Sequence, residues 1–347
     1  MLKLEQYDQL MPTNKKPTRD LDRKLAKIHA GKYKPADFII ADAKDADMAF
    51  GVMAPAPHPG KTWGDSGPGI YRTRQDYISH MQTLINQGQL DIMLTSASNG
   101  EQLAKKSGNF KKVTLAIRGN DATDIWNPRG TNYPVNKSIP FQTVNLKRIR
   151  KFCDLVLYSL TFNNDLDADL RSLQAYREFR IEAADLGVRH FMEVFNPNAP
   201  VGLKKSDEAS MVNDHIIRTL AGVTEAERPA FLKIAYNGGK HLRELVEHDS
   251  STIVGLLGGS AGTTRDTFEL LQRGEQAGAR VALFGRKIQR AESQTDIVRL
   301  MRPVIEGKIS PTQAVKDYHA ALAKLKITPL RSLDSDLQIT DPALLGE

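Results

Sequence analysis

Eight short apolar segments, separated by longer helix-like stretches, are the feature that most restricts how this chain can fold. Such alternation predicts right-handed βαβ crossovers and a parallel sheet. The near-continuous apolarity of the segments suits strands that are buried on both faces. Eight such units over roughly 250 residues predict an α/β fold of the (β/α)8, or TIM, barrel type. The predicted strands are 38–41, 91–95, 113–117, 155–160, 190–194, 231–235, 253–257 and 281–284.

The barrel is expected to occupy residues 37–328, between an N-terminal extension at 1–36 and a C-terminal tail at 329–347. A doubly wound open sheet would show a similar pattern, but no glycine-rich dinucleotide motif follows the first strand. Two long connections rich in Pro and Gly, 51–75 and 119–140, follow the first and third strands. Loops of this length are usually lids or oligomer contacts, and in a barrel both would lie over the catalytic face.

Helix signals support this division of the chain. A helix from Asp20 to His29 is predicted in the extension, which we expect to form an arm packed on the barrel or on a neighbouring subunit. Thr263 is expected to begin a helix that runs to Gln276, and Ser310 to begin another with Gln313 closing a capping box. The tail after Thr328 is expected to be irregular.

Composition restricts the class of protein. The 48 Lys and Arg residues exceed the 41 Asp and Glu residues by seven, and they are spread along the chain. Nucleic-acid binding would ask for a dense basic stripe with interleaved aromatics, so none is predicted. The single cysteine, Cys153, fits a reducing compartment. No apolar stretch approaches the roughly 18 residues that span a bilayer, and no signal peptide is evident, so no membrane association and a cytoplasmic location are expected.

Lys233 is the most informative single residue, because it interrupts the apolar strand 231–235. Alternation places its side chain on the barrel interior with Phe231 and Ala235. A buried ammonium costs several kcal/mol unless it pairs with a carboxylate or loses its proton, and the free amine is a nucleophile toward carbonyls. From the strand alone, an ion pair without chemistry and a nucleophile are equally open interpretations.

Two glycine sites downstream favour the nucleophile. Gly258, Gly259 and Ser260 end the seventh strand, and Gly285 and Arg286 end the eighth. Small residues let backbone N–H groups approach a phosphate, and the loops after these two strands are the recurrent phosphate site of the fold. We therefore predict these residues to bind a substrate phosphate, with Arg118 at the end of the third strand as a further candidate for an anionic group.

Carboxylates and a tyrosine complete the predicted site. Asp42 ends the first strand and Glu193 lies within the fifth, where pairing with Lys233 is the simplest reason for a charge. Tyr158 on the fourth strand is a candidate proton donor, although tyrosines at such places are more often core residues. Asp45 and Asp47 are expected to be loop carboxylates or a helix start. The eight histidines show no metal spacing, so no metal and no other cofactor are predicted.

The residues quoted so far resemble class I aldolases of the deoxyribose-phosphate, tagatose-bisphosphate and archaeal-type fructose-bisphosphate group. Phe231-Leu232-Lys233-Ile234 resembles the strand whose lysine forms the Schiff base in that family. The runs 257–263 and 285–288 resemble its two glycine-rich strand ends, Ile40-Ala41-Asp42 its first-strand aspartate, and Phe191-Met192-Glu193 its fifth-strand glutamate. Leu256-Leu257, Thr161 and Leu157 depart from the lysine, tyrosine and lysine that different members carry on the seventh and fourth strands.

The resemblance implies an aldehyde-lyase that makes or breaks a C–C bond of a phosphorylated ketose through an iminium on Lys233. Its partners would be the phosphorylated sugar and further copies of the chain in a homo-oligomer. A barrel enzyme that binds sugar phosphates without covalent catalysis, such as an isomerase or epimerase, is an alternative. A catalytically altered binding or regulatory protein is another, and the unmatched acid on the fourth strand favours it.

Overall fold

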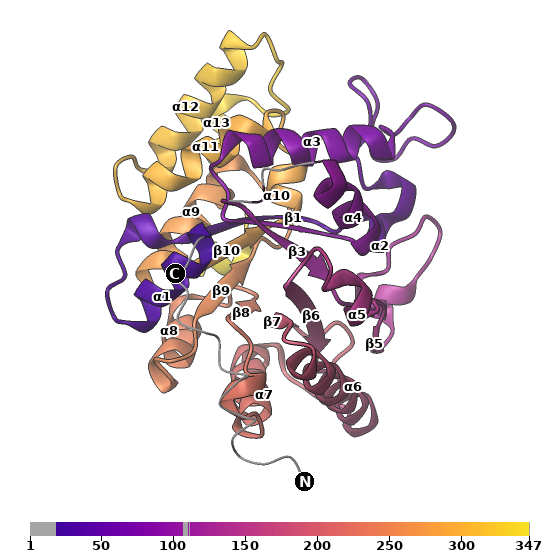
Figure 1. Ribbon diagram of the computed structural model, residues 1–347. Coiled ribbons are helices and arrows are strands. Elements are labelled where there is room, and N and C mark those ends of the chain that lie inside the picture. Colours follow the sequence, from indigo (N-terminus) through magenta and orange to yellow (C-terminus); the bar gives the residue numbers. More distant parts are fainter. Residues whose placement is uncertain (1–18, 107–109, 111, 347) are drawn as a thin grey trace.

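The computed structural model describes residues 19–106, 110 and 112–346. Eight parallel strands close into a barrel in the order β1-β10-β9-β8-β7-β6-β3-β2 (Figure 1), which confirms the predicted fold and all eight strands. The barrel strands are β1 (Ile39–Lys44), β2 (Ile92–Thr95), β3 (Thr114–Arg118), β6 (Leu155–Thr161), β7 (Arg189–Phe195), β8 (Leu232–Ile234), β9 (Val254–Leu257) and β10 (Val281–Phe284).

Helices surround the barrel and bury the outward faces of its strands. Helices α11 and α12 both pack against α9 and lie beside each other (Figure 1). The helices are α1 (Asp20–His29), α2 (Asp47–Phe50), α3 (Arg74–Gln87), α4 (Ala97–Lys106), α5 (Leu146–Ile149), α6 (Leu166–Asp185), α7 (Glu208–Ala221), α8 (Gly239–His248), α9 (Thr264–Gln276), α10 (Arg286–Gln289), α11 (Gln294–Ile305), α12 (Pro311–Lys324), α13 (Leu333–Asp336) and α14 (Pro342–Leu345).

The helix starts follow from their capping residues. Thr263 accepts a hydrogen bond from the backbone N–H of Asp266 and closes a capping box at α9, so this predicted helix is confirmed. Ser310 caps α12 by accepting from the N–H of Gln313, as predicted. The Gln313 side chain instead donates to Asp317 at 2.8 Å, so the expected capping box is only half formed.

Alternate residues of each strand point into the barrel and form a core of their own. Because parallel strands stagger around a barrel, these side chains stack in layers from one end to the other. The Phe191 and Phe231 rings stack with their centroids 4.6 Å apart. The interior cluster consists of Leu21, Leu25, Ile39, Ala41, Ala43, Ile92, Leu94, Ala116, Leu155, Leu157, Phe191, Phe231, Ile253, Val281 and Leu283.

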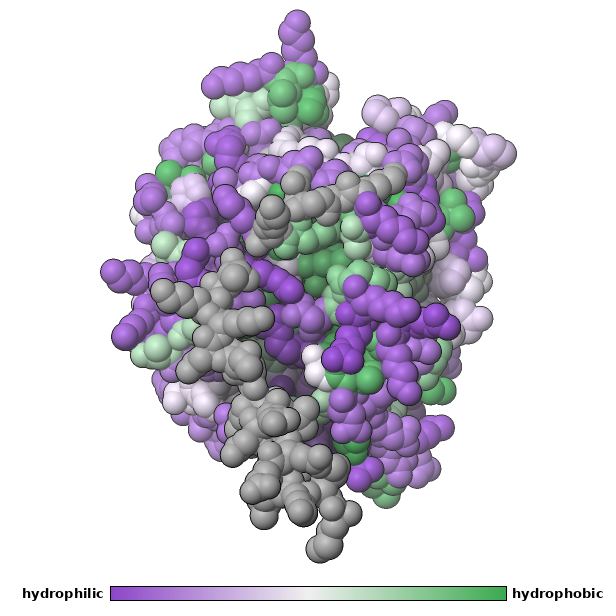
Figure 2. All heavy atoms as spheres, viewed as in Figure 1, coloured by the Kyte–Doolittle hydropathy of each residue, from purple (hydrophilic) through white to green (hydrophobic). Residues whose placement is uncertain are grey.

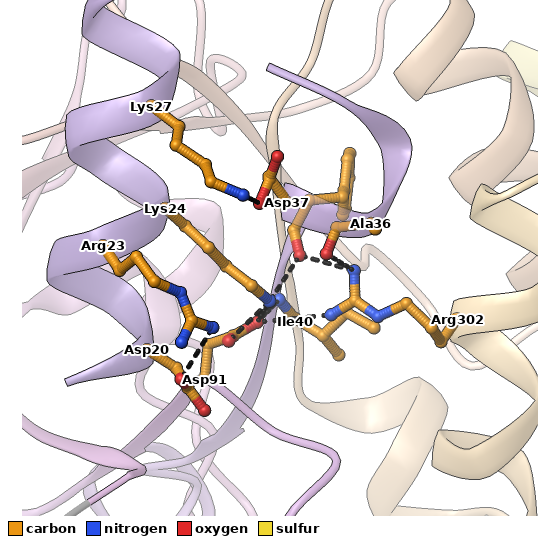
Figure 3. A network of polar contacts seen from close by, with 10 residues as sticks. Asp20, Arg23, Lys24, Lys27, Ala36, Asp37, Ile40, Asp91 and Arg302 are labelled. Carbon is orange, nitrogen blue, oxygen red and sulfur yellow. Dashed lines mark hydrogen bonds and ion pairs between the residues drawn. The ribbon is translucent and has the colours of Figure 1, made fainter. Parts of the chain in front are cut away.

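The helix α1 closes the end of the barrel where the strands begin. Its residues Leu21 and Leu25 belong to the interior cluster, so the predicted arm packs on the barrel, while residues 1–18 of the predicted extension lie outside the described part. Between these leucines, the Lys24 ammonium donates to Asp91 at 2.6 Å and to the Phe38 carbonyl at 3.0 Å (Figure 3).

Arg302 from α11 completes this network. Its guanidinium donates to the Phe38 carbonyl at 2.7 Å and lies 3.4 Å from Asp91, so two cations share one carboxylate (Figure 3). Asp91 also accepts from the backbone N–H of Ile40 at 2.8 Å. The network ties α1, α11 and the starts of β1 and β2 together, at the end of the barrel opposite the strand termini that carry the predicted site.

Both long connections are ordered and touch each other. The second contains the antiparallel pair β4 (Asn120–Ala122) and β5 (Pro140–Gln142). The Arg129 guanidinium lies over the ring of Tyr71 from the first loop, at 5.9 Å, and the N–H of Asn127 donates to the carbonyl of Ala49. The two long loops therefore contact each other beside the barrel.

The tail differs from prediction, because it contains α13 and α14. The carboxylate of Asp266 accepts from the backbone N–H groups of Thr340 and Asp341, and Asp336 accepts from the N–H of Thr264 at 2.8 Å. These bonds hold the tail against the start of α9. Among the helices of the described residues, none is long and apolar enough to cross a membrane. Figure 2 shows a largely hydrophilic face, with apolar side chains gathered near its middle.

Candidate active site

Lys233 lies inside the barrel, as its strand position predicts, and is only 5% exposed. Strand β8 pairs with β7 in a register that sets Lys233 beside Glu193, and the Nζ and Oε1 atoms are 2.6 Å apart. On its other side Lys233 is in register with Gly255 of β9. A Cβ on Gly255 would lie 2.7 Å from the Leu232 carbonyl oxygen, so only glycine permits this close pairing beside the lysine.

A serine holds the second oxygen of the Glu193 carboxylate. The Ser159 hydroxyl on β6 donates to Oε2 of Glu193 at 2.6 Å and accepts from Nη2 of Arg118 at 2.9 Å. The backbone of Ser159 is fixed in turn by Asn120, whose side chain accepts from its N–H at 2.7 Å and donates to its carbonyl at 2.9 Å. Both carboxylate oxygens therefore have partners, which the burial of a charge requires.

Arg118 lies at the centre of the site and is 3% exposed. Its Nη1 donates to Oδ2 of Asp45 at 2.9 Å, its Nε donates to the Asn120 carbonyl at 2.9 Å, and Nη1 is 3.6 Å from Oε2 of Glu193. A guanidinium held on three sides by the protein itself has little capacity left for a substrate phosphate. The placement favours Arg118 as a support for the two carboxylates, and its predicted role in phosphate binding stays a prediction.

Asp45 is the carboxylate that the sequence reasoning missed. Burial raises its pKa, but the nearby charges of Arg118 and Lys233 outweigh burial, so the pKa of Asp45 lies below its ordinary value. The same carboxylate and Glu193 raise the pKa of Arg118 against the effect of burial. The alternation of side chains along the first strand could have revealed Asp45. The strand extends to Lys44, Ala41 and Ala43 face the barrel interior, and the next residue on that face is Asp45.

The structure places the predicted catalytic residue Asp42 elsewhere. The Asp42 side chain points to the outer face of β1. Its carboxylate is 3.0 Å from Nζ of Lys44, and both side chains are completely buried. Burial raises the pKa of Asp42 against the opposing charge of Lys44, and burial lowers the pKa of Lys44. Asp42 therefore belongs to a buried ion pair under the helices, and Asp45 takes the place beside Arg118 and Lys233.

Tyr158 also lies outside the barrel interior. Its ring packs between Tyr176 and Phe179 of α6, with centroids 5.3 and 4.5 Å away, on the face of β6 opposite to Ser159. The placement does not support its predicted role as a proton donor, and Tyr158 is the core residue that its apolar surroundings favoured. The Thr161 hydroxyl donates to Asp124 of the second long loop at 2.6 Å.

The glycine-rich loop after β9 exposes a series of backbone donors. Within residues 19–106, 110 and 112–346, the N–H groups of Gly259, Ser260, Ala261 and Gly262 have no hydrogen-bond acceptor. Gly259 and Gly262 have φ values of 64° and 60°, in the left-handed region that favours glycine. Successive free N–H groups with such glycines can form a concave site for an anion, and the phosphate binding predicted for Gly258, Gly259 and Ser260 stays a prediction.

The next amides along the chain are already occupied. Asp266 of α9 accepts from the N–H of Thr263 at 2.9 Å and Asp336 of the tail from that of Thr264 at 2.8 Å, so two amides at the start of α9 already have carboxylate partners. Directly after β10, Gly285 lies close to Ala43, since a Cβ on Gly285 would be 3.0 Å from the Ala43 carbonyl oxygen. The exposed side chain of Arg286 follows it. An anion at this end is therefore restricted to the loop 258–262 and the turn at Gly285 and Arg286.

No group of three or more His, Cys, Asp or Glu side chains that could hold a metal occurs among the described residues. A cavity of about 870 Å³ lies between α4 and α5 and does not contain Lys233. The arrangement at Lys233 consists of two cations, Lys233 and Arg118, and two carboxylates, Glu193 and Asp45. Such a site can pass a proton between an amine and a carboxylate without any net change of charge in the interior.

No family model and no curated protein matches this sequence. Similar solved structures include an archaeal fructose 1,6-bisphosphate aldolase, at 14% identity, 83% coverage of this chain, 99% of that chain and a TM-score of 0.60. A structure of an archaeal fructose-1,6-bisphosphate aldolase with its catalytic Lys covalently bound to the carbinolamine intermediate of the substrate is 14% identical, with 82% of this chain and 99% of that chain covered and a TM-score of 0.60. A Corynebacterium glutamicum protein is 15% identical, with 89% of this chain and 99% of that chain covered and a TM-score of 0.58. At these identities the likeness establishes the (β/α)8 fold of this chain.

Proposed function

We propose that this protein is a class I aldolase that cleaves or forms a C–C bond of a phosphorylated ketose through a Schiff base on Lys233. The observation that carries the proposal is the contact of 2.6 Å between Nζ of Lys233 and Oε1 of Glu193 inside the barrel. An amine must lose a proton before it can attack a carbonyl, and here the acceptor for that proton touches it. The fold shared with Schiff-base aldolases supports the proposal.

Glu193 can serve each proton transfer of the reaction. It takes a proton from the Lys233 ammonium, and the free amine adds to the ketose carbonyl to give a carbinolamine. The protonated Glu193 then gives its proton to the carbinolamine hydroxyl, which leaves as water, and the iminium remains. As the C–C bond beta to the iminium carbon breaks, the electron pair moves to the iminium nitrogen and Glu193 accepts the proton of the departing alcohol, which becomes an aldehyde.

The remaining steps restore the enzyme. The enamine left on Lys233 takes at carbon the proton that Glu193 accepted from the alcohol and becomes an iminium again, and water adds to release the ketone and the lysine ammonium. Throughout, Ser159 keeps a hydrogen bond to Oε2 of Glu193, so the other oxygen faces Lys233. Asp45, held by Arg118 and carrying a pKa below its ordinary value, remains ionised and stabilises the cationic iminium electrostatically.

The anionic end of the substrate would rest on the loop after β9. Four consecutive N–H groups without acceptors in the described part, from Gly259 to Gly262, support this assignment together with the exposed Ser260 hydroxyl. Gly285 and the exposed Arg286 after β10 complete the predicted phosphate site. We propose the phosphate there because the interior around Lys233 already balances its own charges.

One observation favours a non-covalent sugar-phosphate isomerase or epimerase as the alternative. Lys233 is paired with a carboxylate at 2.6 Å, an arrangement that a barrel enzyme can also use as an ion pair without forming a covalent bond. In that function Glu193 would move a proton between substrate carbons, and Lys233 would stay an ammonium that polarises the carbonyl.

A product analysis separates the two functions. Wild-type protein is incubated with a panel of ketose mono- and bisphosphates, and the products are identified by NMR. The aldolase predicts an aldehyde and a shorter ketone, which disappear in Lys233→Met and persist in the exposed control Lys240→Met. Only rearranged sugars, with no cleavage product from any ketose, would favour the isomerase. Circular dichroism confirms that both variants are folded.

A further inference from the structure

We propose that Lys287 is a positioning residue for the anion site: from behind the loop after β9 it fixes the Ala261 peptide and supplies the buried positive charge that a phosphate on Gly259–Gly262 requires. The inference rests on the proposed function for the identity of the phosphorylated substrate, but the anion site and its test do not depend on catalysis at Lys233. Lys287 follows Arg286 in α10 and is 3% exposed.

The geometry connects Lys287 directly to the loop. Its Nζ donates to the carbonyl oxygen of Ala261 at 3.4 Å. In a trans peptide the C=O and the following N–H point in opposite directions, so this bond turns the N–H of Gly262 away from Lys287. The same peptide unit carries one of the four free donors of the loop. Holding the carbonyl therefore fixes the direction of a donor before any anion arrives.

The charge of Lys287 is only partly balanced by the protein. Burial lowers its pKa to about 8, against the opposing charges of Asp266 on α9 and Asp341 in the tail, while Arg286 on its own helix lowers the pKa further. Asp266 is already occupied, because its carboxylate accepts from Thr263, Thr340 and the N–H of Asp341. A bound dianion nearby would supply the missing negative charge and favour the ammonium form of Lys287.

The amides at the start of α9 leave the loop as the place for the anion. Asp336 of the tail occupies the N–H of Thr264 and Asp266 of α9 occupies that of Thr263, so these two donors are not available to the substrate. The anion is then left with the loop donors in front of Lys287. The Lys287 side chain thus connects α10 to the loop, and we expect its loss to weaken anion binding without changing the chemistry at Lys233.

Sulfate is the probe that tests this, because its charge does not change between pH 6 and 10. In calorimetric titrations of the full-length protein at pH 7, Lys287→Met is expected to weaken sulfate binding about five- to tenfold, while the exposed control Lys316→Met leaves it unchanged. Lys287→Arg, which keeps a charge, is expected to restore part of the affinity. With a phosphorylated substrate, KM should rise in Lys287→Met with kcat nearly constant.

The wild-type protein supplies a second readout that needs no folded variant. Sulfate affinity should fall as the pH rises from 7 through about 8 to 9.5, since Lys287 loses its charge there. Equal affinity of wild type and folded Lys287→Met would overturn the proposal. Where the variant does not fold, an affinity in wild type that is constant over this range would overturn it. Sulfate binding without any cleavage activity would instead contradict the aldolase and leave the anion site standing.

Discussion

Lys233 and Glu193 lie opposite each other on the neighbouring strands β8 and β7, with Nζ and Oε1 2.6 Å apart and both side chains nearly inaccessible to solvent. A pair in this place can be an anchor of the fold or the reactive centre of an enzyme. We favour the second, because Ser159 and Arg118 support the pair and Asp45 beside them follows the carboxyl end of β1, at the end of the barrel where enzymes of this fold bind substrates.

Replacing Glu193 with glutamine removes the proton acceptor but keeps a hydrogen-bonding group of the same shape. We expect Glu193→Gln to lower kcat about 100-fold or more, because general acid–base catalysis contributes at least that much. Steady-state cleavage rates check this, with Glu101→Gln, which changes only a surface ion pair with Lys105, as the control. A Glu193→Gln enzyme with wild-type kcat would show that another group moves the protons.

The hydroxyl of Ser159 joins Glu193 to Arg118, so its removal tests whether this support matters. Ser159→Ala is expected to lower the free energy of unfolding by about 1–3 kcal/mol, since a buried carboxylate oxygen and a buried guanidinium each lose a partner. Urea denaturation measures the change. Ser79→Ala, which removes a solvent-exposed hydroxyl on α3, should cost much less, and an equal cost for both would refute a special role for Ser159.

His190 predicts how stability depends on pH. Burial lowers its pKa to about 3, and the ring lies 2.9 Å from the Tyr176 hydroxyl. Because the unfolded chain binds the proton near pH 6.5 and the folded chain does not, stability is present above pH 6.5 and is lost as the pH falls. The expected loss is up to about 1.4 kcal/mol per pH unit between 6.5 and 3.

Matched variants separate the contribution of His190 to this pH dependence from the contributions of the other titratable groups. His190→Gln should show a shallower loss of unfolding free energy with falling pH than wild type, measured by urea denaturation at several pH values. His29→Gln, at an exposed position at the end of α1, should keep the wild-type slope. Identical slopes in all three proteins would mean that folding does not lower the pKa of His190.

The contacts of Asp336 allow a prediction of how much the tail contributes to the stability of the protein. Its carboxylate accepts from the N–H of Thr264 at 2.8 Å and lies 3.0 Å from Nε2 of His319. We expect Asp336→Ala to destabilise the protein by about 1–3 kcal/mol, as the loss of a buried helix cap would. The exposed neighbour Asp334 supplies the control variant Asp334→Ala. Thermal unfolding compares the two, and an equal stability would show that the tail does not hold α9.

The sequence was sufficient for the fold and for the central pair, because period-two alternation in β8 and β7 puts Lys233 and Glu193 on one face. It misplaced the first-strand carboxylate because Ile40 and Ala41 are both apolar and give no sign of which face is inside. Asp42 then seemed to end the strand, whereas the strand continues to Lys44 and Asp45 reaches the site. Arg118 and Ser159 acquire their roles only from the pairing of β3 with β6, which no local pattern reveals.

The proposed Schiff base requires a covalent bond between Lys233 and the substrate, and borohydride reduction traps that bond. Wild-type protein is incubated with a ketose phosphate that it cleaves or binds, then reduced, digested and analysed by mass spectrometry. We predict a reduced adduct on the peptide that contains Lys233, at that residue, in wild type and in Lys240→Met but not in Lys233→Met. A cleaved ketose with no adduct, or an adduct confined to other lysines, would contradict the account.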